Sequence, residues 1–184
     1  MRLEGRRAGE VDVLADASVA LDDAYRDVRA KAGKGPGHAR DVAAVLRAAG
    51  CSDAVQIAGL LHDVVEDTPW SVDDVAARFG PEIARWVEAL TDDDGIGSYR
   101  RRKRVLREQI AAAGAPVTDI ALADKIASLR YLRITGGRLP KRKRAHYEAT
   151  LAIAGPTAQP GLAGEVADLL DALAERDAPA AGSP

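Results

Sequence analysis

The stretch LLHDVVEDT, residues 60–68, decides how the rest of this chain is interpreted. It combines one histidine and three carboxylates with two pairs of large apolar residues. In an α-helix each residue turns the side chain by about 100°, so the four polar residues would share an arc of roughly 140° and the leucines and valines would lie opposite. The polar residues of that arc are His62, Asp63, Glu66 and Asp67.

This polar face contains no Lys or Arg, so its carboxylates would repel one another unless a positive charge lies among them. A divalent metal ion supplies such a charge. The alternative is an ordinary acidic helix face beside a capping Thr68, which is the usual explanation of a single His-Asp pair. The stretch alone leaves both interpretations open.

Composition favours an all-α protein that forms one domain. A chain of 184 residues is long enough to bury a sizeable core, and its 47% hydrophobic and 29% charged residues are typical of globular proteins. Much of the apolar share is alanine and only 4% of residues are aromatic, which favours closely packed helices over a sheet. A net charge of −2 gives no reason to expect nucleic-acid binding.

The compartment is predicted from cysteine usage and hydropathy. Cys51 is the only cysteine, so no disulfide framework exists and a reducing cytoplasm is expected. The first residues contain no apolar run of signal-peptide length, and no segment approaches a membrane span. We therefore expect a cytoplasmic protein with no membrane partner.

Apolar residues recur at helical spacing between Gly- and Pro-containing breaks, and no segment shows strand alternation. Residues 11–175 are predicted to form a single helical bundle, while residues 1–10 and 176–184 are predicted to be flexible. The last helix either covers the core or forms a homodimer contact. The predicted helices span 11–32, 38–49, 53–67, a short segment capped by Ser71, 81–90, 98–113, 117–132, 141–153 and 162–175.

Two more residues extend the candidate metal site. His38 directly follows the break at residues 33–37, and Asp124 lies within an otherwise apolar helix, where an acid is costly to bury unless it is paired or bound to metal. Taken singly, His38 fits a loop and Asp124 fits an acceptor for a neighbouring helix. Together with His62 and Asp63 they supply two imidazoles and two carboxylates, which suit Mn²⁺, with Fe²⁺ or Zn²⁺ as alternatives.

These residues resemble the HD-domain metal-dependent phosphohydrolases, and more narrowly the (p)ppGpp hydrolases of the RelA/SpoT group, especially their stand-alone alarmone hydrolases. The signature of that subgroup, HDxxEDT, matches residues 62–68. The resemblance covers about residues 20–153. Its further matches are Ala58-Gly59-Leu60-Leu61, Phe79-Gly80, Leu90-Thr91-Asp92-Asp93, Arg102-Lys103, Leu122-Ala123-Asp124-Lys125-Ile126 and Leu129-Arg130.

The resemblance implies an all-α, single-domain bundle of the HD type that removes the 3′-pyrophosphate of (p)ppGpp to give GDP or GTP and pyrophosphate. It implies one metal ion, expected to be Mn²⁺, held by His38, His62, Asp63 and Asp124. Glu66 and Asp67 would position and deprotonate the attacking water, which agrees with the general chemistry of carboxylates beside a metal-bound water. A solvated helix end is the alternative for these two acids.

Substrate contacts are expected from basic and polar residues near these motifs. Arg102 and Lys103 match a family position and are predicted to contact phosphate, while the other cations of residues 100–107 are predicted to be solvated. Lys143 and Tyr147 lie one helical turn apart and are candidates for contacting the far end of the substrate. The alternative for this pair is a core Tyr beside a solvated Lys. The remaining candidates are Lys31, Lys34, Lys125, Ser128 and Arg130.

Two positions differ from the family pattern. Residues 35–39 read GPGHA and lack the Tyr before and the Pro after the first His, and Ser128 stands where the family has Asn. Both positions act on substrate choice, so hydrolysis of another nucleotide carrying a 2′- or 3′-phosphate is the first alternative. A non-catalytic nucleotide-binding module is the second. In each case the expected partner is a small phosphorylated nucleotide and not a nucleic acid.

Overall fold

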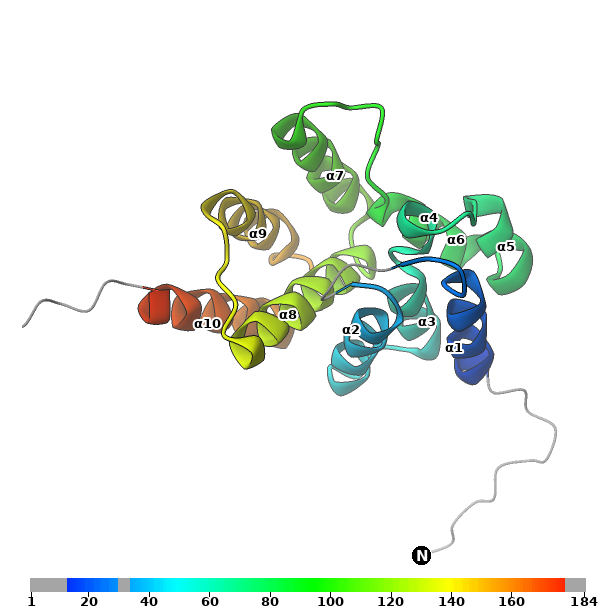
Figure 1. The fold of residues 1–184 in the computed structure, drawn as a ribbon, viewed down its shortest axis with the longest axis horizontal. Coiled ribbons are helices and arrows are strands. Elements are labelled where there is room, and N and C mark those ends of the chain that lie inside the picture. The colour runs from blue at the N-terminus through cyan, green and yellow to red at the C-terminus, as the bar shows by residue number, and fades with distance from the viewer. Residues whose placement is uncertain (1–12, 30–33, 178–184) are drawn as a thin grey trace, which may run out of the picture.

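The computed structural model describes residues 13–29 and 34–177. Within these ranges all regular structure is helical, which confirms the all-α prediction (Figure 1). The helices are α1 (Val13–Ala24), α2 (Pro36–Ala48), α3 (Asp53–Leu61), α4 (Val64–Asp67), α5 (Val72–Phe79), α6 (Pro81–Leu90), α7 (Tyr99–Ala113), α8 (Val117–Thr135), α9 (Lys141–Ala154) and α10 (Pro160–Asp177).

Most predicted helices are confirmed to within three residues of their ends, but two are wrong in extent. The predicted helix over 11–32 ends at Ala24, where the Arg26 and Val28 amides bond to carbonyls only three residues back. The predicted helix over 53–67 is broken into α3 and α4. Helix α10 continues to Asp177, beyond the predicted end at 175. The segment predicted to be flexible at 1–10, the rest of the predicted tail at 178–184, and Lys31 lie outside the described residues.

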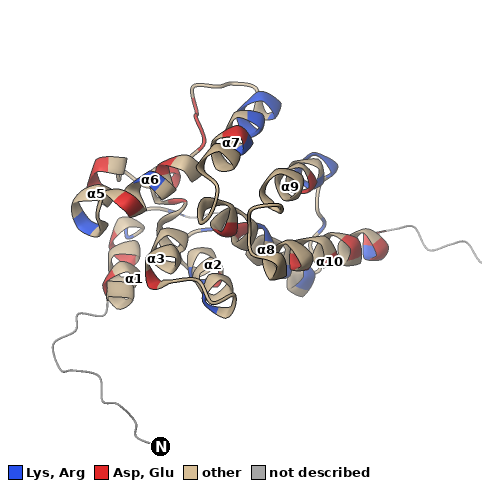
Figure 2. Ribbon diagram, turned by 180° about the vertical axis from the view of Figure 1, so that it is seen from behind, with Lys and Arg blue, Asp and Glu red and all other residues tan. Residues whose placement is uncertain are grey.

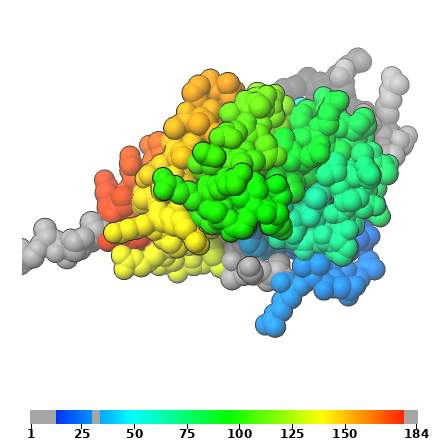
Figure 3. Space-filling view, turned by 90° about the horizontal axis from the view of Figure 1, so that it is seen from above, coloured from blue at the N-terminus to red at the C-terminus, as the bar shows by residue number. Residues whose placement is uncertain are grey.

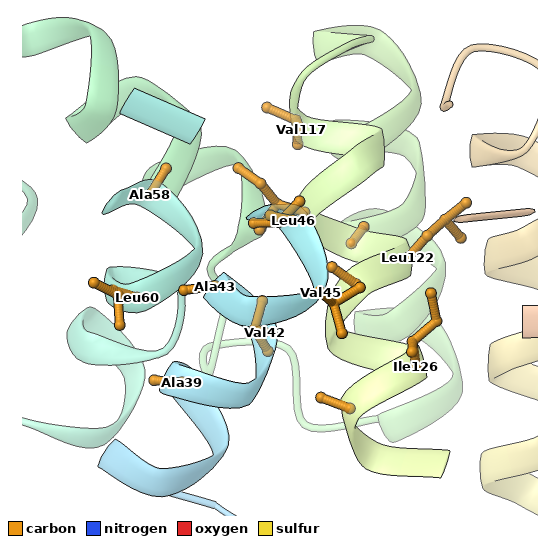
Figure 4. Packing of buried hydrophobic residues seen from close by; sticks show 14 of the residues in the cluster. Ala39, Val42, Ala43, Val45, Leu46, Ala58, Leu60, Val117, Leu122 and Ile126 are labelled. Atoms are coloured by element: carbon orange, nitrogen blue, oxygen red, sulfur yellow. The ribbon is translucent and has the colours of Figure 1, made fainter. Parts of the chain in front are cut away.

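The centre of the core is the contact of α2 with α3 and α8 (Figure 4). Leu46, Leu122 and Ile126 are fully buried there. Helices α2 and α3 pack closely because α3 has glycine at the crossing, where a Cβ atom on Gly59 would lie 2.4 Å from Leu46 Cδ1. This close approach fixes the position of the C-terminal end of α3, which the HDxxEDT motif directly follows.

Helix α10 covers the core within the chain. Its apolar residues are buried against α8 and α9, which confirms that this helix covers the core, one of the two roles predicted for it. A homodimer remains a prediction. Among the described residues no helix combines the length and apolar character needed to cross a membrane. The buried residues of α10 are Leu162, Val166, Leu169, Leu170 and Leu173.

Candidate active site

Three helices bring His38, His62 and Asp124 together. His38 lies in the first turn of α2, His62 directly follows α3, and Asp124 lies in the middle of α8. The His38 Nε2 atom is 2.8 Å from Asp124 Oδ1, and His62 Nε2 is 3.9 Å from the same oxygen. Donor atoms of the three side chains all lie within 4.8 Å of one another, and both histidines are buried. Three predicted metal ligands, separated by 86 positions in sequence, therefore form one cluster.

The sequence prediction of one continuous helix through the motif is corrected by the break at Asp63. The Asp63 backbone has φ −100° and ψ 0°, and α4 starts only at Val64. The His62 Nδ1 atom lies 2.7 Å from the Gly59 carbonyl oxygen. In a continuous helix this carbonyl would accept from the Asp63 amide, so the imidazole takes the place of a backbone donor. This contact orients the His62 ring, whose Nε2 atom lies 3.9 Å from Asp124 Oδ1.

The donor atoms fit a divalent metal ion. Since Nδ1 of His62 donates to the Gly59 carbonyl, Nε2 faces the carboxylates. This buried atom makes no well-aligned hydrogen bond in the described residues, although Asp63 Oδ1 lies 3.3 Å away. A metal ion among these atoms would satisfy Nε2. A histidine fixed through its other nitrogen by a carbonyl is the usual arrangement of a metal-binding imidazole.

The fourth predicted ligand, Asp63, lies beside this cluster. Its Oδ1 is 3.3 Å from His62 Nε2, and its Oδ2 accepts a hydrogen bond from Lys34 Nζ at 2.6 Å. Burial opposes ionisation of Asp63, but His62 and Lys34 outweigh this effect and hold the pKa of the carboxyl well below its usual range. Asp63 is therefore an anion within reach of the cluster, and its role as a ligand stays a prediction.

The electrostatic field at the cluster favours a cation. Burial opposes protonation of His62, yet the nearby Asp63 and Asp124 carboxylates raise its pKa to about 9. Burial also opposes ionisation of Asp124, but Lys125, His38 and Lys34 hold its pKa well below the usual range. A bound cation would occupy the same field and displace the proton of His62.

Glu66 and Asp67 differ in their surroundings. Glu66 is half-buried, and its Oε1 accepts a hydrogen bond from the Asp92 amide at 2.6 Å. Burial raises the pKa of Glu66, and the Asp92 amide offsets only part of that shift. Asp67 is exposed and its Oδ2 accepts from the Tyr25 hydroxyl at 3.2 Å. The alternative of a solvated helix end therefore describes Asp67 better than Glu66, and the catalytic roles of both stay predictions.

A cleft of about 310 Å³ opens beside Asp124. Six of the predicted substrate contacts line it, which are Lys34, Lys103, Lys125, Ser128, Lys143 and Tyr147. Four more lining residues were not predicted: Tyr99, Pro140, Arg142 and His146. We call this space the metal-side cleft. It places cations and a tyrosine next to the candidate metal cluster, as a phosphorylated substrate requires.

Two predicted substrate contacts do not line the metal-side cleft. Arg130 is exposed and donates to Glu165 of α10 at 2.6 Å, so the structure places it outside the metal-side cleft, and its contact with substrate stays a prediction. Arg130 lies six positions after Asp124, so its side chain is about 120° around the helix axis from Asp124, whereas Ser128, four positions on, is only about 40° away. Arg102 lies with its Nε 3.5 Å from the Asp92 carboxylate and donates to the Ile96 carbonyl.

Asp92 is a residue whose role in the site the sequence prediction missed. Its amide donates to Glu66, and its carboxylate accepts from Lys103, a residue that lines the metal-side cleft. Asp92 therefore connects the candidate base to a candidate phosphate contact. The signal was present in the sequence, because Leu90-Thr91-Asp92-Asp93 is one of the matching family motifs.

His146 makes the stability of the fold depend on pH. Burial, together with the charges of Lys125, Lys103 and Arg107, lowers the pKa of His146 to about 3, although Asp124 acts in the opposite direction. An unfolded histidine has a pKa of about 6.5. Below that value the unfolded chain binds a proton that the folded chain does not, so stability falls as the pH drops from about 6.5 toward 3.

We expect this residue to remove about 2 kcal/mol of unfolding free energy between pH 7 and pH 5, at about 1.4 kcal/mol per pH unit below 6.5. Urea unfolding of the wild type and of His146→Gln at both pH values measures it. Other titrating groups act on both proteins, so the difference between the two losses isolates His146. Equal losses in both proteins would show that the imidazole is protonated in the folded state.

Comparison with known proteins places the chain in a family. Residues 17–160 match the HD-domain family. The chain belongs to the HD-domain family. The match includes the three residues of the candidate metal cluster and both acids of α4, so the resemblance expected from the sequence is confirmed at this level.

Several relatives of this HD-domain protein are similar in sequence. Guanosine-3′,5′-bis(diphosphate) 3′-pyrophosphohydrolase MESH1 of Drosophila melanogaster is 38% identical over 99 residues, which are 53% of this chain and 55% of that protein. The human protein of the same name is 41% identical over 85 residues, 46% of this chain and 47% of that protein. The matched region thus spans about half the length of these curated relatives.

Solved structures agree over a longer part of the chain. A structure described as a metazoan ortholog of SpoT that hydrolyzes ppGpp superposes with a TM-score of 0.73 and 26% identity, covering 90% of this chain and 97% of that one. A protein of Listeria monocytogenes EGD-e superposes with a TM-score of 0.67 and 27% identity, covering 75% of this chain and 94% of that one. The helical arrangement in Figure 1 is therefore that of an HD-domain fold.

Proposed function

We propose that this HD-domain protein is a metal-dependent phosphohydrolase that removes the 3′-pyrophosphate of (p)ppGpp, giving GDP or GTP and pyrophosphate. The observation that carries the proposal is that Asp124, one member of the His38, His62 and Asp124 cluster, lines the metal-side cleft. A phosphorylated ligand in that cleft would lie beside Asp124 and against four lysines, Lys34, Lys103, Lys125 and Lys143. The similarity to ppGpp hydrolases supports the choice of substrate.

The residues divide the chemistry among them. A divalent ion, which we propose to be Mn²⁺, would be held by His38, His62 and Asp124 with Asp63 completing the set, and would polarise the phosphoryl group and acidify a water. Glu66 is the proposed general base, because its half-buried carboxylate has a raised pKa and therefore a higher proton affinity than an exposed one.

Lysines of the metal-side cleft would neutralise the phosphate groups. Lys125 and Lys34 contact the carboxylates of Asp124 and Asp63, so they lie at the boundary between the cluster and the cleft. Lys143 lies 5.6 Å from the centroid of the Tyr147 ring and has no carboxylate partner in the described part of the chain. These cations would bind the pyrophosphate that leaves. We also propose that the enzyme acts in the cytoplasm, where its nucleotide substrate would occur.

Pyrophosphate release from ppGpp by the purified protein tests the proposal. We expect release with added Mn²⁺, none after treatment with EDTA, and recovery when Mn²⁺ is restored. Parallel assays contain nucleotides with a 2′- or 3′-monophosphate. Phosphate release from those nucleotides, with ppGpp left intact, would support the proposed metal site and would show that ppGpp is not the substrate. Absence of turnover of every nucleotide, despite bound Mn²⁺, would favour a binding module.

A further inference from the structure

A second cleft, of about 440 Å³, lies between α7 and α9 and continues the metal-side cleft. The two clefts share four lining residues, Tyr99, Lys103, Arg142 and His146. Arg100 and Arg107 line only the second cleft, while Asp124 lines only the first. We call the second space the outer cleft, because it begins where the metal-side cleft ends. Figure 3 shows α7, in green, beside the yellow and orange residues of α9 on the same face.

The outer cleft is lined by positive charge that the protein leaves largely unpaired. Among the described residues, Arg100, Arg107 and Arg142 form no ion pair with a carboxylate, and only Lys103 does. The Arg142 guanidinium lies 4.2 Å from the centroid of the Tyr99 ring, which holds it at the junction of the two clefts. Figure 2 shows the Lys and Arg residues gathered at the adjoining ends of α7 and α9.

These cations also lie where helices disfavour them. The first turns of α7 and α9 contain no acidic residue, although the N-terminal end of a helix carries partial positive charge and is stabilised by anions. Cations placed there interact unfavourably with the helix dipole. A ligand with several negative charges would offset both the repulsion among the side chains and the unfavourable dipole.

His146 adds a buried hydrogen-bonding group that faces both clefts. Only 6% of the residue is exposed, and Arg107 Nη1 lies 3.0 Å from its Nδ1 atom. Because the guanidinium can only donate, Nδ1 accepts and the proton of the neutral imidazole is on Nε2. No protein group in the described residues bonds to Nε2. This N–H is therefore available to an acceptor in the cleft, such as a phosphate oxygen.

We propose that the outer cleft binds the phosphate groups of the substrate that are not attacked, namely the 5′-diphosphate or 5′-triphosphate of the alarmone. This inference rests on the proposed function. It assigns the 3′-pyrophosphate to the metal-side cleft, with Tyr99, Arg142 and His146 between the two ends, and the 5′ chain to Arg100 and Arg107. The cleft thus selects nucleotides that carry phosphates at both ends over those that carry one.

The test compares two substrates and two charge-matched variants. The substrates are ppGpp and guanosine 3′-diphosphate with a 5′-hydroxyl. The cleft variant is Arg100→Gln with Arg107→Gln, and the control is Arg101→Gln with Arg104→Gln, on the same helix but lining neither cleft. We expect the cleft variant to raise KM for ppGpp by about tenfold or more relative to KM for the 5′-hydroxyl compound, since charged hydrogen bonds are lost. The control should leave that ratio unchanged.

A binding measurement separates this inference from the proposed function. Titration calorimetry measures the binding of tripolyphosphate in the presence of EDTA to the wild type and to both double variants. Arg100→Gln alone is a further cleft variant, in case the double cleft variant fails to fold. We expect weaker binding, by about tenfold, in the cleft variants only. If no nucleotide is hydrolysed but this pattern appears, the proposed function is wrong and the phosphate site stands.

Two other outcomes overturn the inference. If ppGpp is hydrolysed but the cleft variant behaves as the control does in both assays, the outer cleft binds no phosphate. If tripolyphosphate binding depends on Arg100 and Arg107 while the ratio of KM values does not, the cleft takes free polyphosphate and not the 5′ end of the substrate.

Discussion

Replacing Asp124 with asparagine is expected to abolish stabilisation of the protein by Mn²⁺ and to lower turnover by at least a factor of about 100. Changes in the residues that merely support metal ligands cost about 10- to 100-fold, so loss of a ligand should cost more. The Asp124 carboxylate lies 2.8 Å from His38 Nε2 and also accepts from Lys125, so the variant loses both the ligand and a buried ion pair.

Thermal unfolding measures the metal effect independently of activity. A ligand present at about 100 times its Kd stabilises the folded state by about 2.7 kcal/mol, which raises the Tm of a domain of this size by roughly 5–10 °C. We expect this increase for the wild type with Mn²⁺ and none for Asp124→Asn. Metal content after dialysis gives a second readout.

Asp119→Asn is the matched control. Asp119 lies on the same helix, is buried, and accepts a hydrogen bond from the Gln159 amide at 2.7 Å. Its replacement should lower the basal Tm and leave the Mn²⁺-dependent increase intact. An increase retained by Asp124→Asn would mean that the ion binds elsewhere. Removing one member of a buried ion pair costs about 3–5 kcal/mol, so both variants are compared with their own metal-free baselines.

Sequence reasoning succeeded where one local rule governs the outcome. Helix positions followed from apolar spacing and from Gly and Pro breaks, and the cap predicted at Ser71 is formed, as a capping box with Asp74. The candidate metal cluster was predictable because His38, His62 and Asp124 belong to three separate motifs that recur in order along the chain. Chemistry, and not periodicity, identified Asp124, since an acid in an apolar helix needs a partner.

Sequence reasoning failed where side chains compete with the backbone or where distant helices meet. Regular helical geometry predicted a continuous helix through Asp63, and could not anticipate that the His62 imidazole would take the Gly59 carbonyl. His146 was not among the predicted site residues, because nothing in its sequence neighbourhood shows that α7 packs against α9. Arg130 is a different case, since its angular offset from Asp124 could have excluded it from the pocket.

Replacing Glu66 with glutamine is expected to lower kcat by a factor of about 10² to 10⁴, the usual contribution of a general base. The amide oxygen of glutamine can still accept from the Asp92 amide, so the contact that positions residue 66 is retained while proton acceptance is lost. Mn²⁺ binding should therefore be unchanged, which separates this variant from Asp124→Asn. Single-turnover rates at saturating ppGpp measure the chemical step directly.

Two further variants decide which acid of α4 is the base. Asp67→Asn keeps an acceptor for the Tyr25 hydroxyl, and because Asp67 is exposed we expect a smaller loss of kcat than for Glu66→Gln. Glu88→Gln, at an exposed position of α6, is the control and should leave kcat unchanged. A larger loss in Asp67→Asn would assign the base to the exposed carboxylate. Full activity in both variants would remove α4 from proton transfer, because neither amide accepts a proton near neutral pH.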